Sequence, residues 1–410
     1  MPPLTAFRRN LALFALALGG FAIGTTEFAT MGVLPEIAND LLPGYEADPQ
    51  RVIAQAGTLI TLYALGVVVG APVFAVLGAR MSQTKLALWL LVLLIAGTVG
   101  SALVPGFGAV AVFRFISGLP HGAYFGVASL LAARLMGPGN MGKGIALAMS
   151  GLTVANVIGV PLSTVLGQQL GWRWVYGLVA VLFVATLLLV ALYVPRFPGS
   201  PERSPLRELS ALGSARVWIM VAVLAIGFGG FFAVYSYIAE VTTREAGLGA
   251  GMVPWVIATM GIGMVLGNIL GGILTDRSPV GTAIWGFVLF IGSFVLYSLF
   301  AAHPVGLFVF AFLVSLASSV VLPTLQARLI RMSSEARLLG AALNHAAGNV
   351  ANSLGAWLGG LVIAGGFGYL APGWLGAGLA LAGFALLLVS LAVQRRDGGR
   401  SIDTAGIPVL

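Results

Sequence analysis

Residues 10–35 read NLALFALALGGFAIGTTEFATMGVLP, a run in which Glu27 is the only charged side chain. At a rise of about 1.5 Å per residue, a helix of this length can cross the hydrocarbon core of a bilayer, which is about 30 Å thick. An ionisable group inside such a segment is costly unless it has a partner, a hydrated cavity or a function. The stretch therefore predicts a membrane helix that carries a functional carboxyl group.

The rest of the chain repeats this apolar character. Hydrophobic residues make up 59% of the 410 residues and charged residues 8%, against about 25% charged in a soluble domain. Cysteine is absent, which excludes disulfides and thiol chemistry. Apolar runs of about 18 residues or more predict twelve membrane helices, near residues 10–34, 51–77, 86–104, 107–135, 142–169, 172–194, 216–240, 252–275, 280–301, 304–330, 337–365 and 371–393.

The basic residues orient these helices. Of the 21 Lys and Arg residues, all but Arg51, Arg114, Arg173 and Arg244 fall on one side of the predicted membrane. Cytoplasmic loops carry an excess of Lys and Arg, so we expect both termini in the cytoplasm of a bacterial inner membrane. The net charge of +8 is therefore a topology signal, and there is no clustered basic surface that would predict nucleic-acid binding.

Short motifs recur between the two halves of the chain. Residues 154–159 (VANVIG) recur as residues 350–355 (VANSLG). Gly66, Gly70 and Arg80 match Gly263, Gly267 and Arg277 at nearly the same offset. Such repeats are typical of transporters built from two related halves. We predict an N-terminal six-helix bundle (1–194), a cytoplasmic linker (195–215), a C-terminal six-helix bundle (216–393) and a cytoplasmic tail (394–410).

Small residues recur every four positions on four predicted helices. Such faces let helix backbones approach closely. Static packing explains each glycine singly, whereas their equivalent places in the two halves suggest a sliding or rocking interface as well. The four faces are Gly66 and Gly70; Gly151, Ala155, Gly159, Ser163 and Gly167; Gly263, Gly267 and Gly271; and Ala347, Ala351, Gly355 and Gly359.

Two motifs resemble those of the major facilitator superfamily. Residues 114–126 (RFISGLPHGAYFG) resemble its fourth-helix signature. Residues 150–163 (SGLTVANVIGVPLS), followed by Gly-Trp-Arg at 171–173, resemble the antiporter motif of its fifth helix. The resemblance extends over essentially the whole chain.

Further motifs resemble the arabinose-efflux-permease-like and sugar-efflux-like branch of the twelve-span drug:proton antiporters. They are TTEF at residues 25–28, LPE at residues 34–36, and Asn344-His345 with residues 349–360 (NVANSLGAWLGG). The resemblance implies an all-α integral membrane fold of twelve transmembrane helices in two pseudo-symmetric six-helix bundles. It also implies that the second helix packs on the eleventh and the fifth on the eighth, which are the helices with the small-residue faces.

The loop after the second helix departs from the superfamily pattern. The superfamily carries a charge latch, Gly-x-x-x-Asp-Arg-x-Gly-Arg, at this place, but residues 75–80 read AVLGAR and Ala79 replaces the acid. Residues 272–277 (GILTDR) keep the second copy better. We expect the latch to depend on Asp276 and Arg277, with Arg80 as the remaining first-half member.

Three residues are candidates for proton coupling. Glu27 and Arg114 lie at similar depths in antiparallel helices, so an ion pair between them is possible. Desolvation raises the pKa of a carboxyl group and a nearby guanidinium lowers it, so Glu27 is a candidate proton carrier or a permanently paired structural charge. Arg114 stays protonated and either tunes Glu27 or holds the fourth helix. His121 either relays protons or is simply hydrogen-bonded.

Other polar and aromatic residues are candidates for binding a substrate or packing helices. Aromatic walls with few polar groups are typical of small-molecule sites, although lipid-facing placement is common for aromatics in membrane helices. The substrate candidates are Tyr63, Tyr124, Phe125, Phe231, Tyr235, Trp357, Ser319, His345 and Asn349. The helix-interface candidates are Gly151, Asn156, Gly159, Gly267, Asn352 and Gly355, with Asn156 expected to bond across an interface. Glu240 and Arg244, four residues apart, are predicted to form a solvent-exposed ion pair at the end of a helix; the alternative is that they gate the transport path.

These features predict a proton-coupled antiporter that exports small organic solutes, such as amphenicol drugs, sugars or nucleoside-like metabolites, by alternating access. We expect a monomer in the lipid bilayer, with a small solute and protons as its partners and with no nucleic acid, cofactor or metal. A gradient-independent facilitator is the nearest alternative. A membrane enzyme or a sensor is remote, because no metal-ligand spacing, phosphate loop or appended soluble domain is present in the sequence.

Overall fold

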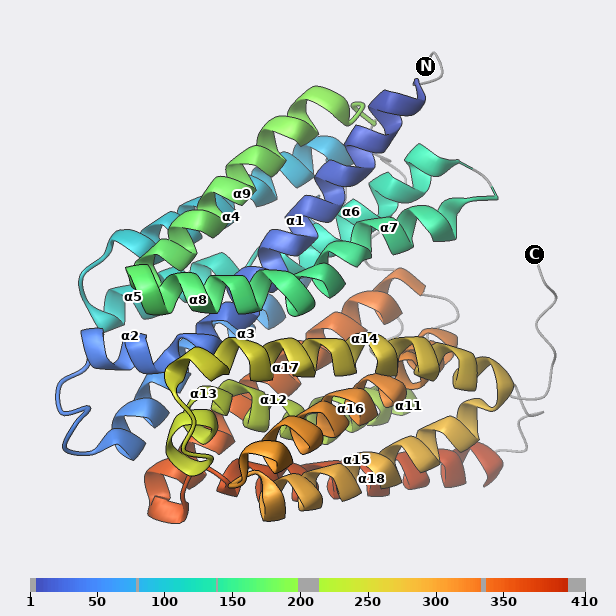
Figure 1. Ribbon diagram of the computed structural model, residues 1–410. Helices are drawn as coiled ribbons and strands as arrows, with labels where there is room; N and C mark the ends of the chain where they lie inside the picture. Colours follow the sequence, from blue (N-terminus) through green and yellow to red (C-terminus); the bar gives the residue numbers. More distant parts are fainter. Residues whose placement is uncertain (1–4, 79–80, 138, 198–213, 333–336, 397–410) are drawn as a thin grey trace.

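The computed structural model describes residues 5–78, 81–137, 139–197, 214–332 and 337–396. Helices form the whole of the regular structure in these ranges, which contain no strand. Two groups of helices, one from each half of the chain, lie against each other (Figure 1). The all-α prediction is confirmed.

The N-terminal half consists of the following elements: α1 (Ala6–Gly32), α2 (Leu34–Leu41), α3 (Pro49–Gly78), α4 (Gln83–Leu103), α5 (Phe107–Gly118), α6 (His121–Met136), α7 (Met141–Val154), the π-helix η1 (Ala155–Gly159), α8 (Val160–Leu170) and α9 (Trp172–Tyr193). The C-terminal half consists of α11 (Ala215–Gly227), α12 (Gly229–Ser236), α13 (Ile238–Glu240), the π-helix η3 (Val241–Glu245), the 3-10 turn η4 (Ala250–Met252), α14 (Val253–Arg277), α15 (Pro279–Phe300), α16 (Pro304–Met332), α17 (Arg337–Val362), the π-helix η5 (Ile363–Phe367) and α18 (Ala371–Arg396).

Twelve of the helical segments are long and apolar enough to cross a membrane. Each coincides with one of the twelve spans expected from the apolar runs, so the predicted number is confirmed. The fourth span is interrupted between α5 and α6, where Pro120 lacks the backbone N–H that would continue the ladder. The fifth is interrupted by η1, immediately before Pro161. These irregular turns lie beside the polar residues of the candidate site.

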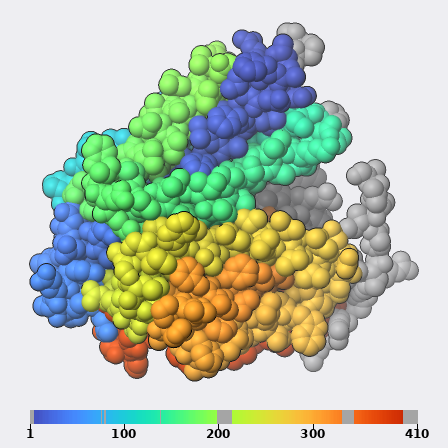
Figure 2. Space-filling model, viewed as in Figure 1, coloured from blue at the N-terminus to red at the C-terminus, as the bar shows by residue number. Residues whose placement is uncertain are grey.

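The start of α1 and the end of α18 lie at one end of the molecule (Figure 1), which we call the terminal end; the opposite end, with α2 and α13, is the loop end. Between the halves, α3 packs against α17, and α14 packs against α8 and η1. The larger apolar core crosses the interface, since it joins residues of α1 to α3 with residues of α12 to α14. In Figure 2 the two halves meet toward the loop end and part toward the side of the termini.

The small-residue faces pack within the halves, which corrects the expectation that they form a rocking interface. A Cβ atom added to one of these glycines would meet backbone of the same half at a distance too short for two non-bonded atoms. The added Cβ atom would lie 1.9 Å from the Ala17 carbonyl oxygen at Gly151, 2.2 Å from that of Leu316 at Gly267, 2.1 Å from that of Gly229 at Gly355, and 2.3 Å from that of Phe115 at Gly66. At Gly159 it would meet the side chains of Thr25 and Phe21 on α1.

Other glycines bring the two halves together. A Cβ atom on Gly261 of α14 would lie 2.4 Å from the carbonyl oxygen of Asn156 in η1. One on Gly57 of α3 would lie 2.3 Å from the hydroxyl of Tyr237. The interface therefore runs along helix faces that the four-residue period did not mark.

Some predictions fall on residues outside the described ranges. Most of the expected linker (195–215), most of the expected tail (394–410) and Arg80 lie there. The domain boundaries at these places therefore stay a prediction.

Candidate functional site

Glu27 lies between the two halves. The residue is 7% exposed, and its Oε1 accepts a hydrogen bond of 2.9 Å from the side-chain amide of Asn352 on α17. Asn352 is fully buried, and its own Oδ1 has no partner among the described residues. A carboxyl group of α1 is thus joined to the C-terminal half by one amide.

Arg114 on α5 is held beside this contact by neutral groups. Its Nη1 donates to Thr26 Oγ1 at 3.1 Å. Its guanidinium carbon lies 4.2 Å from the ring centre of Tyr63 and 5.4 Å from that of Tyr176, within the range of cation–π attraction. Within the described part of the chain Arg114 and Glu27 form no ion pair, so the pairing considered for them is not present. Arg114 lies close to Glu27 because its hydrogen-bond partner, Thr26, is the residue next to Glu27 in the chain.

The guanidinium is only partly satisfied. Arg114 is 1% exposed, yet neither Nε nor Nη2 has a hydrogen-bond partner among the described residues. Buried polar groups are normally paired. Two guanidinium nitrogens, which carry three N–H groups, are therefore available to acceptors on a bound solute.

A line of ring contacts leads from Arg114 to the other half. The hydroxyl of Tyr63 and Nδ1 of His121 are hydrogen-bonded at 3.0 Å. The His121 ring contacts Phe125, with 5.3 Å between centroids, and Phe125 stacks on His345 of α17 at 5.9 Å. Tyr63 therefore joins His121 to Arg114. Among the described residues His121 and Glu27 form no hydrogen bond.

Aromatic side chains of the C-terminal half lie on the other side of α1. Phe28 contacts Tyr235 edge to face at 5.2 Å and Phe232 at 6.3 Å. The buried hydroxyl of Tyr235 has no partner in the described part of the chain. Phe231 packs against Phe232 and Tyr235. Of the two predicted residues Phe231 and Tyr235, Tyr235 is the one with an unused polar atom close to Glu27.

Asn349 lies one turn before Asn352 on α17. Its amide donates to the carbonyl oxygen of His345 at 3.0 Å, and its Oδ1 has no partner among the described residues. Two buried amide oxygens on one helix face can accept hydrogen bonds from hydroxyl or amino groups of a solute.

Several predicted residues lie elsewhere. The hydroxyl of Tyr124 donates to the carbonyl oxygen of Leu16 within the N-terminal half. Ser319 packs against Gly267 of α14, and Trp357 is 51% exposed. Asn156 donates to Leu152 of its own helix segment rather than across an interface. These side chains serve packing because they face their own half or the surface.

The loop end contains two charged contacts. Within the N-terminal half, Asp40 of α2 accepts from Trp172 Nε1 at 3.0 Å and pairs with Arg173; the hydrogen bond from Arg173 lowers the pKa of Asp40. Between the halves, Tyr45 Oη donates to Glu240 Oε1 at 2.9 Å. Glu240 also pairs with Arg244 and is 1% exposed.

The burial of Glu240 corrects the expectation of a solvated pair. Burial also raises the pKa of its partner Tyr45 to about 12, so this hydroxyl stays a donor. The Gly-Trp-Arg motif likewise gains a physical role, since its Trp172 and Arg173 hold α2 against the N-terminal half.

The expected latch lies at the terminal end. Asp276 and Arg277 at the end of α14 are exposed. Neither forms an ion pair within the described ranges, while Arg80 lies outside them.

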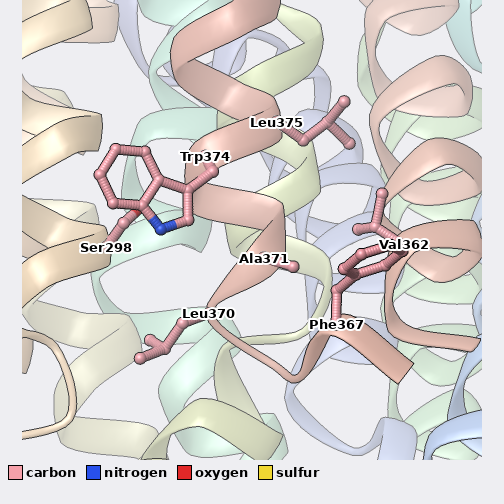
Figure 3. A pocket seen from close by; sticks show the side chains of 7 residues that line it. All are labelled: Ser298, Val362, Phe367, Leu370, Ala371, Trp374 and Leu375. Carbon is pink, nitrogen blue, oxygen red and sulfur yellow. The ribbon is translucent and has the colours of Figure 1, made fainter. Parts of the chain in front are cut away.

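A shallow groove opens at the loop end of the C-terminal half (Figure 3). It lies where α15, the end of α17, η5 and the start of α18 meet, and its walls are almost entirely apolar. The lining residues are Ser298, Val362, Phe367, Leu370, Ala371, Trp374 and Leu375. None of the predicted site residues lines it, so we place the functional site at Glu27 instead. No group of three or more His, Asp or Glu residues in the described ranges is arranged to hold a metal.

The sequence analysis did not predict Thr26, Tyr176 and Phe28 as neighbours of the two charged residues, Glu27 and Arg114. Thr26 and Phe28 flank Glu27, and this adjacency was the available signal. Tyr176 lies on α9, where it hydrogen-bonds Thr30 at 3.0 Å. Nothing in the sequence relates α9 to α1, so this contact required the fold.

Comparison with known proteins gives the family. Residues 16–253 and 237–409 match the sequence profile of the Major Facilitator Superfamily. The chain is 35% identical over 388 residues to the inner membrane transport protein YdhP of Escherichia coli K12, covering 94% of this chain and 97% of that protein. It is 30% identical over 403 residues to the chloramphenicol resistance protein of Streptomyces lividans, covering 97% and 98%.

Solved structures share the fold at low identity. The E. coli xylose transporter XylE, in a partially occluded inward-open conformation, superposes with a TM-score of 0.73 at 14% identity over 94% of this chain and 98% of its own. A bacterial homologue of the lysosomal transporter Spinster, inward-facing and unoccupied, gives 0.69 at 16% identity over 95% and 96%. The chain belongs to the major facilitator superfamily. It is a multi-pass membrane transporter of the inner membrane, and not an enzyme.

Proposed function

We propose that this protein is a proton-coupled antiporter that exports small organic solutes by alternating access. The observation that carries the proposal is the hydrogen bond from Asn352 to Glu27, which joins the two halves through an ionisable group. A hydrogen bond to a carboxylate is roughly twice as strong as one between neutral groups. Protonation of Glu27 therefore weakens a contact between the bodies that must move.

The orientation of the cycle follows from the positive-inside rule. It places the terminal end in the cytoplasm and the loop end outside. The halves are packed together at the loop end, so this arrangement corresponds to an inward-facing state. In the proposed cycle, an outward-facing state protonates Glu27 and releases solute; the inward-facing state loses the proton and accepts new solute. The latch of Asp276 and Arg277, with Arg80, closes the cytoplasmic side in the outward-facing state.

Unused hydrogen-bonding atoms define the solute we propose. Arg114 offers two donor nitrogens, Nε and Nη2. The Oδ1 atoms of Asn349 and Asn352 offer acceptors, and the Tyr235 hydroxyl offers both a donor and an acceptor. Phe28 and Phe232 supply apolar contact. A neutral solute with hydroxyl or amide groups next to an aromatic or apolar part fits this set. Amphenicols and nucleoside-like compounds have this chemistry, and the name of the Streptomyces relative supports the first of them.

A solute in this position also explains coupling. It would compete with Glu27 for the amide of Asn352, so either solute or a proton releases the bond between the halves. An empty and unprotonated carrier keeps the bond and does not change conformation, which prevents leakage of the gradient. Tyr63 and His121 position Arg114 for the solute, and the stack of Phe125 on His345 is a further contact between the halves.

The proposal is tested by transport into proteoliposomes with an imposed pH gradient. Chloramphenicol and a panel of nucleosides serve as probes after a thermal-shift screen identifies binders. We expect Glu27→Gln to bind the solute and to lose gradient-driven accumulation, because its side chain cannot change charge. Glu46→Gln, which alters an exposed acid of the loop after α2, is the matched control and should keep accumulation.

Retained accumulation in Glu27→Gln would remove this carboxyl group from the mechanism. Transport that ignores the pH gradient in the unmodified protein would instead identify a facilitator.

A further inference from the structure

The loop end contains a second junction between the halves, formed by α2 and by the segment from α13 to η3. Here Tyr45 donates across the interface to Glu240, and Arg244 pairs with the same carboxylate. The Arg244 guanidinium also lies 5.4 Å from the Tyr45 ring centre. Since α2 packs directly on α13, whatever separates the halves at this end must break this junction.

Glu36 in the first turn of α2 belongs to the same junction, and among the described residues it forms no ion pair. Its Oε2 is buried and has no hydrogen-bond partner among the described residues. Arg244 is committed to Glu240, and Arg173 to Asp40. The elements that pack on α2 carry the following charged or titratable groups: Arg8, Arg9 and Glu27 on α1, Arg51 and Tyr63 on α3, and Glu240 on α13, with Arg244 beyond it. Asp40 lies on α2 itself, and Tyr45, Glu46 and Asp48 lie in the loop after it.

Closing the loop end therefore packs α2, with the unpartnered Glu36 oxygen, against α13, where Glu240 is paired with Arg244. An unpaired carboxylate that is buried near a like charge is unfavourable unless it binds a proton. We propose that Glu36 and Glu240 form a proton-operated latch: a proton on Glu36 lets the halves close at the loop end, and loss of that proton favours opening.

The direction and size of the effect follow from linkage. Burial, and secondarily the charge of Glu240, raise the pKa of Glu36 from 4.5 to about 6, although its own backbone N–H acts against the rise. When the loop end opens, Glu36 leaves Glu240 and becomes hydrated, so its pKa returns toward 4.5. The form with a closed loop end thus binds the proton more tightly than the open form. The ratio of the closed to the open population therefore falls by about 30-fold as the pH rises from below 4.5 to above 6.

This latch goes beyond the proposed function, because it requires only that the halves separate at the loop end and not that Glu27 carries protons. If the loop end faces the outside, an acidic exterior favours closure. A proton on Glu36 then accelerates the return to the inward-facing state, whatever drives the outward step.

Pulsed electron-spin distance measurements test the latch directly. The chain has no cysteine, so spin labels at Ala47→Cys and Gly249→Cys report only the distance between the halves at the loop end. Both positions are exposed, and the Gly249 Cβ site is free of neighbours within 4 Å. The labelled protein carries Glu27→Gln as well, so that failure of coupling at Glu27 does not affect the result.

We expect the short-distance population in nanodiscs to fall between about pH 4.5 and 6 and to be constant above about pH 7. Glu36→Gln should stay closed at every pH, and Glu240→Gln should move the midpoint to lower pH because the like charge is gone. Glu46→Gln should keep the transition. The same transition in Glu36→Gln, or no transition when Glu36 is present, would overturn the latch.

Discussion

Two buried glutamates join the halves of this transporter, and they are satisfied in different ways. Glu240 at the loop end has a cation, Arg244, and a donor, Tyr45. Glu27 at the centre has one amide, Asn352, and no ion pair among the described residues. Burial raises the pKa of Glu240 above its usual value, while the Arg244 charge beside it acts against the rise. The comparison sets a carboxylate held by a cation and a hydroxyl against one held by a single neutral amide, which we propose is the one that switches.

The largest effect on this comparison is expected from Asn352→Ala. It removes the amide that donates to a buried carboxyl group, and a hydrogen bond to a charged group is worth about 1.5–3 kcal/mol. The closed loop end should lose population by one to two orders of magnitude at neutral pH, measured with the spin-label pair at positions 47 and 249. Asn268→Ala, at an exposed position of α14, should leave the distances unchanged. An unaltered distance distribution in Asn352→Ala would mean that the central bond does not hold the halves together.

An intermediate effect is expected from three glycine variants of the same helix. Gly261→Ala puts a Cβ atom against the Asn156 carbonyl of the other half, Gly267→Ala against Leu316 of the same half, and Gly272→Ala into open space. Overpacking costs about 1–3 kcal/mol. Gly261→Ala should shift the conformational equilibrium toward an open loop end, Gly267→Ala should lower the melting temperature without that shift, and Gly272→Ala should do neither.

Equal distance distributions for Gly261→Ala and Gly267→Ala would contradict the assignment of the first contact to the moving interface and the second to a rigid half.

The smallest effect is expected from Asp40→Asn. Its pair with Arg173 is partly exposed, with side-chain exposures of 38% for Arg173 and 47% for Asp40, and such pairs are worth about 0–1 kcal/mol. The amide oxygen of Asn can still accept from Trp172. Because the pKa of Asp40 is lowered, the pair contributes fully above the ordinary value of 3.8 and is lost only as the pH falls through the lowered one. Thermal unfolding at neutral pH should change by less than about 1 kcal/mol; a large loss would show that α2 depends on this charge.

The membrane fold could be predicted from the sequence in detail. Bilayer thickness imposes a minimum length on apolar runs, which is why all twelve spans were found and why the break at Pro120 is understandable. The partners of the small-residue helix faces could not be predicted from the sequence. In a span that is apolar on every side, no periodic pattern tells which face contacts lipid and which contacts another helix. Gly151 and Gly267 accordingly pack within their own halves.

The polar centre was predictable in its members but not in its pairings. Glu27 and Arg114 were identified because charge inside a membrane helix is rare, yet depth alone cannot distinguish an ion pair from the observed partners Asn352 and Thr26. Their contacts depend on how the helices are rotated about their axes. The burial of Glu240 was missed for a similar reason, because a helix end that looks solvated in the sequence is covered here by the loop after α2.

The account depends on Glu27 exchanging a proton while it lies between the halves. Infrared difference spectra of the reconstituted protein, recorded on acidification, measure this exchange through the carbonyl band of the protonated carboxyl group. Besides the band from Glu36, we predict a second carbonyl band that is present in the unmodified protein and in Glu46→Gln, absent in Glu27→Gln, and shifted in Asn352→Ala. Identical spectra for the unmodified protein and Glu27→Gln would show that this carboxyl group does not titrate and would contradict the proposed coupling.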